Sequence, residues 1–91
     1  MIYRKREDAV SRRVGDEVVI VPIRNNVGDL DSVFTLNEVA ARVWSLLDGT
    51  RDSETVVEVI CDEFEVAPDV AARDVGELFA SLEEARLIER S

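Results

Sequence analysis

The fold is decided at residues 33–49, where the chain reads VFTLNEVAARVWSLLDG. The first residues alternate between apolar and polar, which is typical of a strand. Asn37 is a good helix N-cap, and Glu38 in the first turn suits the helix dipole. Apolar residues then recur at helical spacing, which predicts a helix to about Asp48, ended by a left-handed Gly49. Its inner stripe comprises Leu36, Ala40, Val43, Trp44 and Leu47.

Upstream of this helix the sequence predicts three short antiparallel strands. Residues 9–14, AVSRRV, form the first, and Gly15-Asp16 is a turn signal. Residues 17–21, EVVIV, are a dense β-branched run and form the second strand. Residues 24–29 are rich in turn formers, and residues 30–36 alternate as a third strand. One face of that strand carries Leu30, Ser32, Phe34 and Leu36, and the other carries Asp31, Val33 and Thr35.

Downstream, the sequence predicts two more helices. Asp52 is the expected N-cap of the second, and Pro68 suits the first position of the third. Leu87 and Ile88 then form either a final strand or a packed extension. The second helix has its apolar face in Val56, Val57, Ile60, Cys61 and Phe64. The third has its stripe in Ala71, Val75, Leu78, Phe79 and Leu82.

These elements predict an α+β fold, in which a three-stranded antiparallel sheet is followed by three helices in a winged-helix-like arrangement. A length of 91 residues suits one domain, and no linker divides the chain. We therefore expect a single domain over residues 1–91, with residues 1–7 as a mobile end. No apolar run reaches the length of a membrane span, and residues 1–8 have no apolar segment after them, so a cytoplasmic location is expected.

The composition restricts the chemistry that the chain can perform. There is no histidine, so neither a His-based catalytic pair nor a Cys/His zinc site is expected. Cys61 is the single cysteine, which excludes an intramolecular disulfide, and its apolar neighbours favour an inert buried thiol. Trp44 is more readily a core residue than a stacking platform. We predict no catalytic residue, no metal site and no cofactor, although a perturbed carboxylate keeps a small enzyme as an alternative.

The charge of the chain is acidic and uneven. The net charge is −9, with +2 in residues 1–26 and −11 in residues 27–91. Nucleic-acid binding needs a basic surface, so the acidic helices argue against a winged-helix DNA-binding regulator, which remains the alternative function. A basic peptide segment would be attracted instead.

The stretch at residues 33–49 resembles the PqqD family, named for a protein of pyrroloquinoline quinone biosynthesis. That family has an apolar strand, Leu-Asn, a helix with Trp, and Leu-Leu-Asp-Gly. The similarity extends over about residues 8–89, although Arg86 stands where the family has a glycine. The motif is carried by Phe34, Leu36, Asn37, Trp44, Leu47, Asp48 and Gly49.

The resemblance implies a RiPP recognition element, which binds the leader of a ribosomally made precursor peptide and presents it to a modifying enzyme, often a radical-SAM enzyme. No enzyme domain is present in this sequence, so a free-standing adaptor is expected, either a monomer or a weak homodimer. The precursor, the modifying enzyme and the final product stay open, because the family serves many peptide products.

The family's binding mode implies a site for the leader. The leader would add as a strand to the third strand, with the third helix as the other wall. Asp74 and Glu77 would then meet basic leader residues, and Arg73 an acidic one. The strand wall would comprise Asp31, Ser32, Val33, Phe34 and Thr35. The helix wall would comprise Val70, Arg73, Asp74, Glu77 and Ser81.

Overall fold

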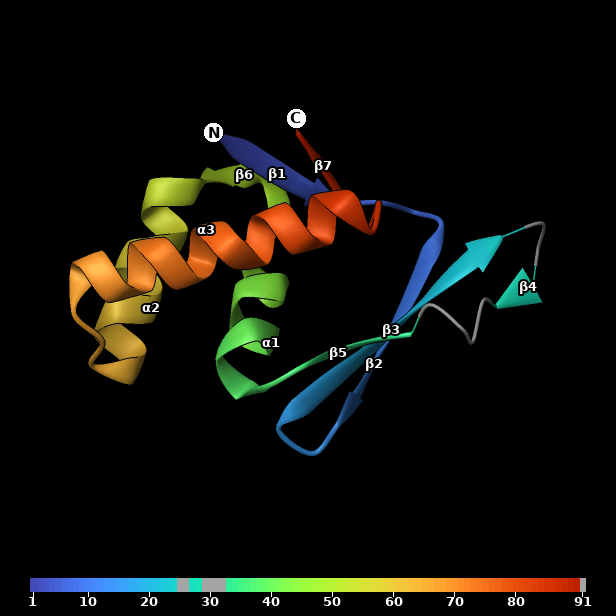
Figure 1. Cartoon of the computed structure of the whole chain (residues 1–91), viewed down its shortest axis with the longest axis horizontal. Helices are drawn as coiled ribbons and strands as arrows, with labels where there is room; N and C mark the ends of the chain where they lie inside the picture. The colour runs from blue at the N-terminus through green and yellow to red at the C-terminus, as the bar shows by residue number, and fades with distance from the viewer. Residues whose placement is uncertain (25–26, 29–32, 91) are drawn as a thin grey trace.

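The structure, a computed structural model, describes residues 1–24, 27–28 and 33–90. It contains two antiparallel sheets and three helices (Figure 1). The strands are β1 (Ile2–Lys5), β2 (Ala9–Val14), β3 (Glu17–Arg24), β4 (Val27–Gly28), β5 (Phe34–Leu36), β6 (Asp48–Asp52) and β7 (Ile88–Arg90). The helices are α1 (Glu38–Leu46), α2 (Ser53–Phe64) and α3 (Pro68–Glu84).

The first sheet is built around β3, which pairs with β2 on one side and with β5 on the other. Val14 and Glu17 close the β2–β3 hairpin across a two-residue turn. Gly15 has a φ of 62° there, a left-handed value that favours glycine at the first central position of such turns. β4 pairs with the far end of β3. Figure 1 shows this sheet extending away from the helices.

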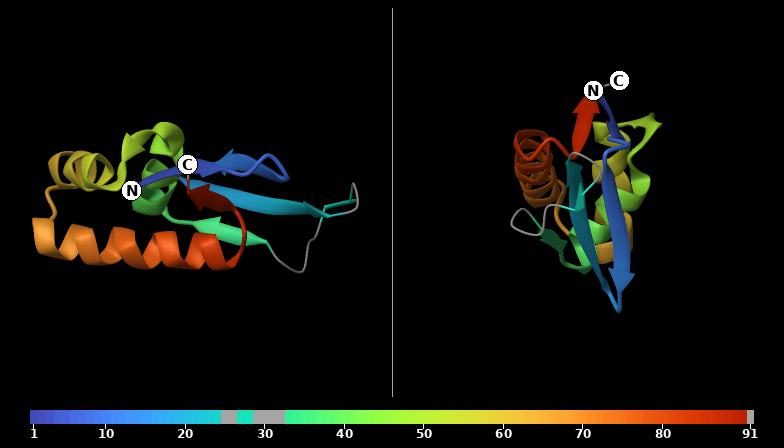
Figure 2. Two further views of the ribbon diagram at one scale, coloured as in Figure 1. Left: turned by 90° about the horizontal axis from the view of Figure 1, so that it is seen from above. Right: turned by 90° about the vertical axis from the view of Figure 1, so that its right-hand side faces the viewer.

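The second sheet joins the two ends of the chain. β1 is its central strand, with β6 on one side and β7 on the other, both antiparallel. Tyr3 is buried and stacks against Phe79 of α3 with the ring centroids 4.6 Å apart. The two chain ends lie close together in Figure 1 and in both views of Figure 2. This sheet is therefore held by contacts between segments far apart in the sequence.

The helix starts follow the predicted caps. The Asn37 side chain accepts a hydrogen bond from the Ala40 N–H at 2.9 Å. Asp52 accepts one from the Glu54 N–H at 3.0 Å, and Pro68 occupies the first turn of α3. These local predictions are confirmed, because each depends on residues within one helical turn.

One hydrophobic core unites the helices with both sheets. Ile20 and Leu36 from the first sheet, Trp44 from α1 and Ile88 from β7 are all buried in it. Trp44 is only 5% exposed, as its place in the predicted helical stripe requires. Cys61 is half-buried against the same cluster.

The antiparallel sheet and the three helices are confirmed, whereas the predicted order of sheet and then helices is wrong. β6 lies between α1 and α2, and β1 precedes the first sheet. The predicted mobile end, residues 1–7, contains the central strand of the second sheet. α1 ends at Leu46 rather than near Asp48, because the next residues pair with β1 as a strand. Gly49 does adopt a left-handed φ of 84°, within β6 rather than at the helix end.

Candidate functional site

The hydrogen-bonding direction of each strand follows from the β2–β3 hairpin. In an antiparallel pair, hydrogen-bonded and non-hydrogen-bonded residue pairs alternate, and a two-residue turn is closed by a hydrogen-bonded pair. The closing pair here is Val14 and Glu17. The Ile23 N–H donates to the Asp8 carbonyl at 2.7 Å, which agrees with this alternation. Odd-numbered residues of β3 therefore direct their N–H and C=O groups toward β2, and even-numbered residues direct theirs toward β5.

The same alternation identifies the exposed backbone groups of β5. Its pairing with β3 joins Ile20 to Phe34 and Val18 to Leu36. Phe34 and Leu36 thus bond to β3, and the N–H and C=O of Thr35 face away from the sheet. Among the described residues, β3 is the strand that pairs with β5, so this outer edge is open. An open edge offers unmet donors and acceptors to an extended peptide.

A groove begins where β5 ends and α1 starts. It has a volume of about 340 Å³ and lies between α1 and α3. Its walls include Asn37 and Val39 on one side and Asp74, Glu77 and Leu78 on the other. The floor is apolar, formed by Val43, Ile60, Ala71 and Val75. In the left view of Figure 2, β5 is drawn between β3 and α3, which places its open edge on the α3 side.

The strand wall predicted from the sequence is partly described. Val33 and Thr35 are exposed, whereas Phe34 is half-buried and packs against the core. This agrees with the alternation expected for a strand with one covered face. Asp31 and Ser32 lie outside the described residues.

The helix wall predicted from the sequence divides into two groups. Asp74 and Glu77 line the groove. At 100° per residue, Val70 and Ser81 fall on the same flank of α3. Arg73 points farther round the helix, and its Nε lies 3.6 Å from Asp74 Oδ1. Arg73 therefore contacts its neighbour rather than the groove.

Three groove residues are missing from the predicted site: Asn37, Val39 and Leu78. The sequence indicates Asn37 as a helix cap and Leu78 as a core residue, and each also lines the groove. Leu78 is half-buried, unlike the fully buried Val75 beside it. An apolar residue at the margin of a helical stripe was the signal in the sequence.

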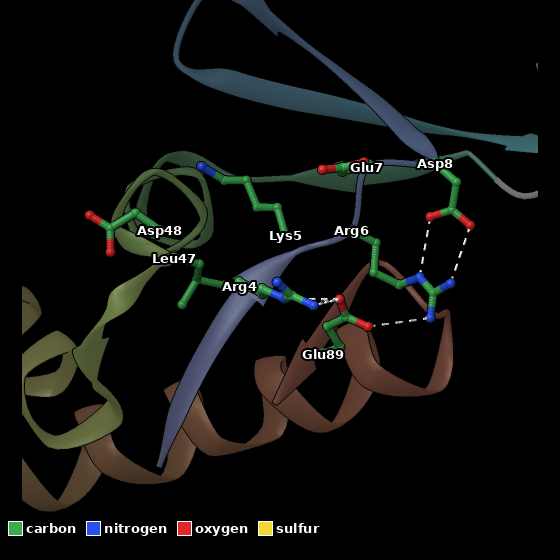
Figure 3. Close-up of a pocket in the computed structure, with 8 residues that line it drawn as sticks. All are labelled: Arg4, Lys5, Arg6, Glu7, Asp8, Leu47, Asp48 and Glu89. Carbon is green, nitrogen blue, oxygen red and sulfur yellow. Dashed lines mark hydrogen bonds and ion pairs between the residues drawn. The ribbon is translucent and has the colours of Figure 1, made fainter. Parts of the chain in front are cut away.

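A larger open pocket, of about 690 Å³, lies against β1 (Figure 3). Arg4 bonds Glu89 at 2.8 Å, and Arg6 pairs with Asp8 at 3.2 Å and with Glu89 at 3.8 Å. Its basic groups are therefore largely engaged with carboxylates of the chain. This pocket is less suited to a ligand than the apolar groove.

Lys5, which lines the same pocket, is held against the core. Its Nζ lies 5.4 Å from the centroid of the Trp44 ring, a cation–π contact. Burial lowers the pKa of the Lys5 amine, and the charge of Asp48 opposes that shift. Figure 3 shows the Lys5 side chain directed toward α1, away from the Arg6–Asp8 pair.

The described residues offer neither a metal-binding cluster nor a membrane-spanning helix. No group of three or more His, Cys, Asp or Glu side chains there is arranged to hold a metal ion. No described helix is both long and apolar enough to cross a membrane.

Comparison with protein-family models decides the relationship. The model for coenzyme PQQ synthesis protein D (PqqD) matches residues 17–88. The chain belongs to the PqqD family. No curated protein sequence matches this PqqD-family chain significantly.

Solved structures of similar fold agree with this membership. TbiB1 in complex with the TbiA(beta) leader peptide is 29% identical, with 94% of each chain covered and a TM-score of 0.79. A lasso peptide synthetase B1 complexed with a leader peptide is 22% identical, covers 98% of this chain and 99% of its own, and has a TM-score of 0.79. The PqqD part of Methylobacterium extorquens PqqCD, described as a stand-alone RiPP recognition element, is 19% identical, with 98% and 89% covered and a TM-score of 0.73.

Proposed function

We propose that this PqqD-family chain binds the leader of a ribosomally made precursor peptide and presents it to a separate modifying enzyme. The observation that carries the proposal is the open edge of β5, next to an apolar groove with acidic side chains on its α3 wall. The leader adds as a strand to β5, bonding to the outward backbone groups of Thr35. Family membership and the leader peptide bound to TbiB1 support this mode.

The groove adds selectivity to these backbone bonds. Apolar leader side chains pack on the floor beneath Leu78 and Val39. Asp74 and Glu77 attract basic leader residues and speed their association. Strand addition alone accepts almost any extended peptide, so these side-chain contacts distinguish one leader from another.

The adaptor performs no catalysis in this proposal, and it needs no cofactor. Its partner is a radical-SAM enzyme or another peptide-modifying enzyme, in the cytoplasm. The chain acts as a monomer that self-associates weakly when no leader covers the β5 edge.

An amide NMR titration tests the proposal. Labelled protein is titrated with a synthetic leader from the short peptide gene nearest its own. We expect shifts at residues 33–35 and on the groove flank of α3, with the β6–β1–β7 sheet unchanged. A scrambled peptide of the same composition is the control. A spectrum that does not move at saturating leader, with or without the modifying enzyme, rejects the adaptor function.

A further inference from the structure

One face of the first sheet carries exposed apolar side chains. Among the described helices, α1 makes the main contacts with β3 and β5. It covers the face that carries Val18, Ile20 and Leu36, which are all buried. By strand alternation, the opposite face carries mostly β-branched side chains. We call it the valine face, and it comprises Val10, Arg12, Val14, Val19, Val21, Val33 and Thr35.

The valine face is more exposed than a structural role requires. Val10 is 56% exposed, Val14 is 58% exposed and Val33 is 41% exposed. Val10 lies directly across from Val21, and continuing the β3–β5 register by one residue brings Val33 beside Val21 from the other side. Contiguous exposed apolar side chains of this kind mark interaction sites in soluble proteins.

Arg12 determines what kind of surface fits there. It lies across from Val19, among the valines, and makes no ion pair with any described residue. Among the described residues of this face, Glu17 is the acidic one, and it makes no ion pair with Arg12. A complementary surface is thus apolar and offers a carboxylate to Arg12.

A second copy of the chain is the alternative occupant. A two-fold interface sets different residues of one face against each other, so Glu17 of one copy would offer a carboxylate to Arg12 of the other. The position of the face favours a different protein.

The position of the valine face relates that protein to the leader. Val33 and Thr35 lie on this face and also border the open edge of β5. A leader strand added to β5 would continue the sheet, and every second leader side chain would extend the valine face. A protein docked there contacts the adaptor and the bound leader at the same time.

We propose that the valine face docks the enzyme that modifies the precursor, through an apolar enzyme surface with a carboxylate that meets Arg12. This inference rests on the adaptor function proposed above. Because the leader enlarges the face, leader and enzyme each raise the affinity of the chain for the other, by the same factor. The enzyme thereby distinguishes the loaded adaptor from the empty one.

The test uses the purified peptide-modifying enzyme encoded next to the gene for this chain, together with the synthetic leader. Two variants alter the valine face, Val10→Lys and Arg12→Glu. Two matched controls, Ser11→Lys and Arg13→Glu, make the same kinds of change at adjacent exposed residues of β2 that point to the other face. Calorimetry measures the Kd of each variant for the leader and, with leader present, for the enzyme.

We expect each face variant to raise the enzyme Kd about tenfold, as the loss of an interface hot spot does. The controls should change it less than about threefold, and the leader Kd should be the same in all four. The double variant Val10→Thr, Val14→Thr keeps side-chain shape and strand propensity, so it should fold normally. It should still raise the enzyme Kd, which would show that the loss comes from missing apolar contact and not from misfolding.

Each other outcome overturns the inference. Equal effects of face and control variants, or no effect of either, remove the valine face as the docking surface. A wild-type dimer in sedimentation that Val10→Lys dissociates assigns the face to a second copy. If wild-type protein binds no leader, the adaptor function itself fails, and this result is distinct from loss of enzyme binding alone.

Discussion

The two sheets of this small domain differ in how completely their apolar side chains are buried. In the β6–β1–β7 sheet, Tyr3 and Ile88 are buried, and the Met1 amino group bonds Asp52 at 2.7 Å. In the β2–β3–β5 sheet, α1 covers one face, and the outer edge of β5 and the valine face stay exposed. The β6–β1–β7 sheet joins the two ends of the chain, and the β2–β3–β5 sheet leaves backbone and apolar groups for partners. Stability and binding are therefore assigned to different sheets, and substitutions should separate them.

The largest effect is expected from Tyr3→Ala in the β6–β1–β7 sheet. Tyr3 stacks on Phe79, and its hydroxyl donates to Glu83 Oε1 at 3.0 Å. Removing this buried ring should lower the free energy of unfolding by about 3–5 kcal/mol in urea titrations. Tyr3→Phe, which loses only the hydroxyl bond, should cost about 1 kcal/mol. Folded Tyr3→Ala should bind leader normally. Weakened binding would show that stability and leader binding do not depend on different sheets.

The next largest effect is expected from Thr35→Pro in the β2–β3–β5 sheet. Proline removes an N–H that faces outward and has no strand partner among the described residues. Leader affinity should fall about tenfold, or roughly 1.4 kcal/mol. Thr35→Val keeps the N–H and serves as the control, with leader affinity changed less than about threefold. Isothermal calorimetry measures the leader affinity of both variants. A Thr35→Pro affinity equal to that of the wild type would rule out strand addition at this position.

A smaller effect is expected from the groove charges. The double variant Asp74→Asn, Glu77→Gln removes the acidic side chains of the α3 wall. Affinity for a basic leader should fall about two- to fivefold at low salt, and the difference should shrink as salt screens these exposed charges. Glu58→Gln with Asp62→Asn, at exposed positions of α2, is the control. An effect that does not depend on salt would contradict an electrostatic role.

The smallest effect concerns the contribution of the β6–β1–β7 sheet to stability at acid pH. The pKa of Asp48 is lowered from 3.8 to about 2, first by the hydrogen bond from the Thr50 hydroxyl and then by the Thr50 N–H. A lowered folded-state pKa stabilises the fold above the unfolded pKa, and this contribution is lost as the pH falls from about 4 to about 2. Asp48→Asn should flatten the stability profile over that range in thermal melts. Thr50→Val should flatten the profile partly, because it removes the hydroxyl bond and keeps the N–H bond. An unchanged profile in both variants would contradict this origin of the lowered Asp48 pKa.

The sequence by itself determined the features that depend on neighbouring residues. The caps at Asn37 and Asp52, the start at Pro68 and the β2–β3 hairpin all follow from interactions within a few residues, and all are present. Helical periodicity likewise placed Val75, Phe79 and Leu82 in the core. The resemblance carried by residues 33–49 indicated the PqqD family correctly.

Only the tertiary structure decided the second sheet and the shape of the groove. β1 pairs with β6 and β7, so residues such as Arg4 and Glu89 meet across most of the chain length. The four residues of β1, IYRK, are too few to give a clear strand signal. Their pairing depends on partners that folding must first bring together. For the same reason, the sequence placed Arg73 on the helix wall and missed Leu78. Which flank of α3 faces the groove depends on how α3 packs on α1, and sequence spacing alone does not specify that packing.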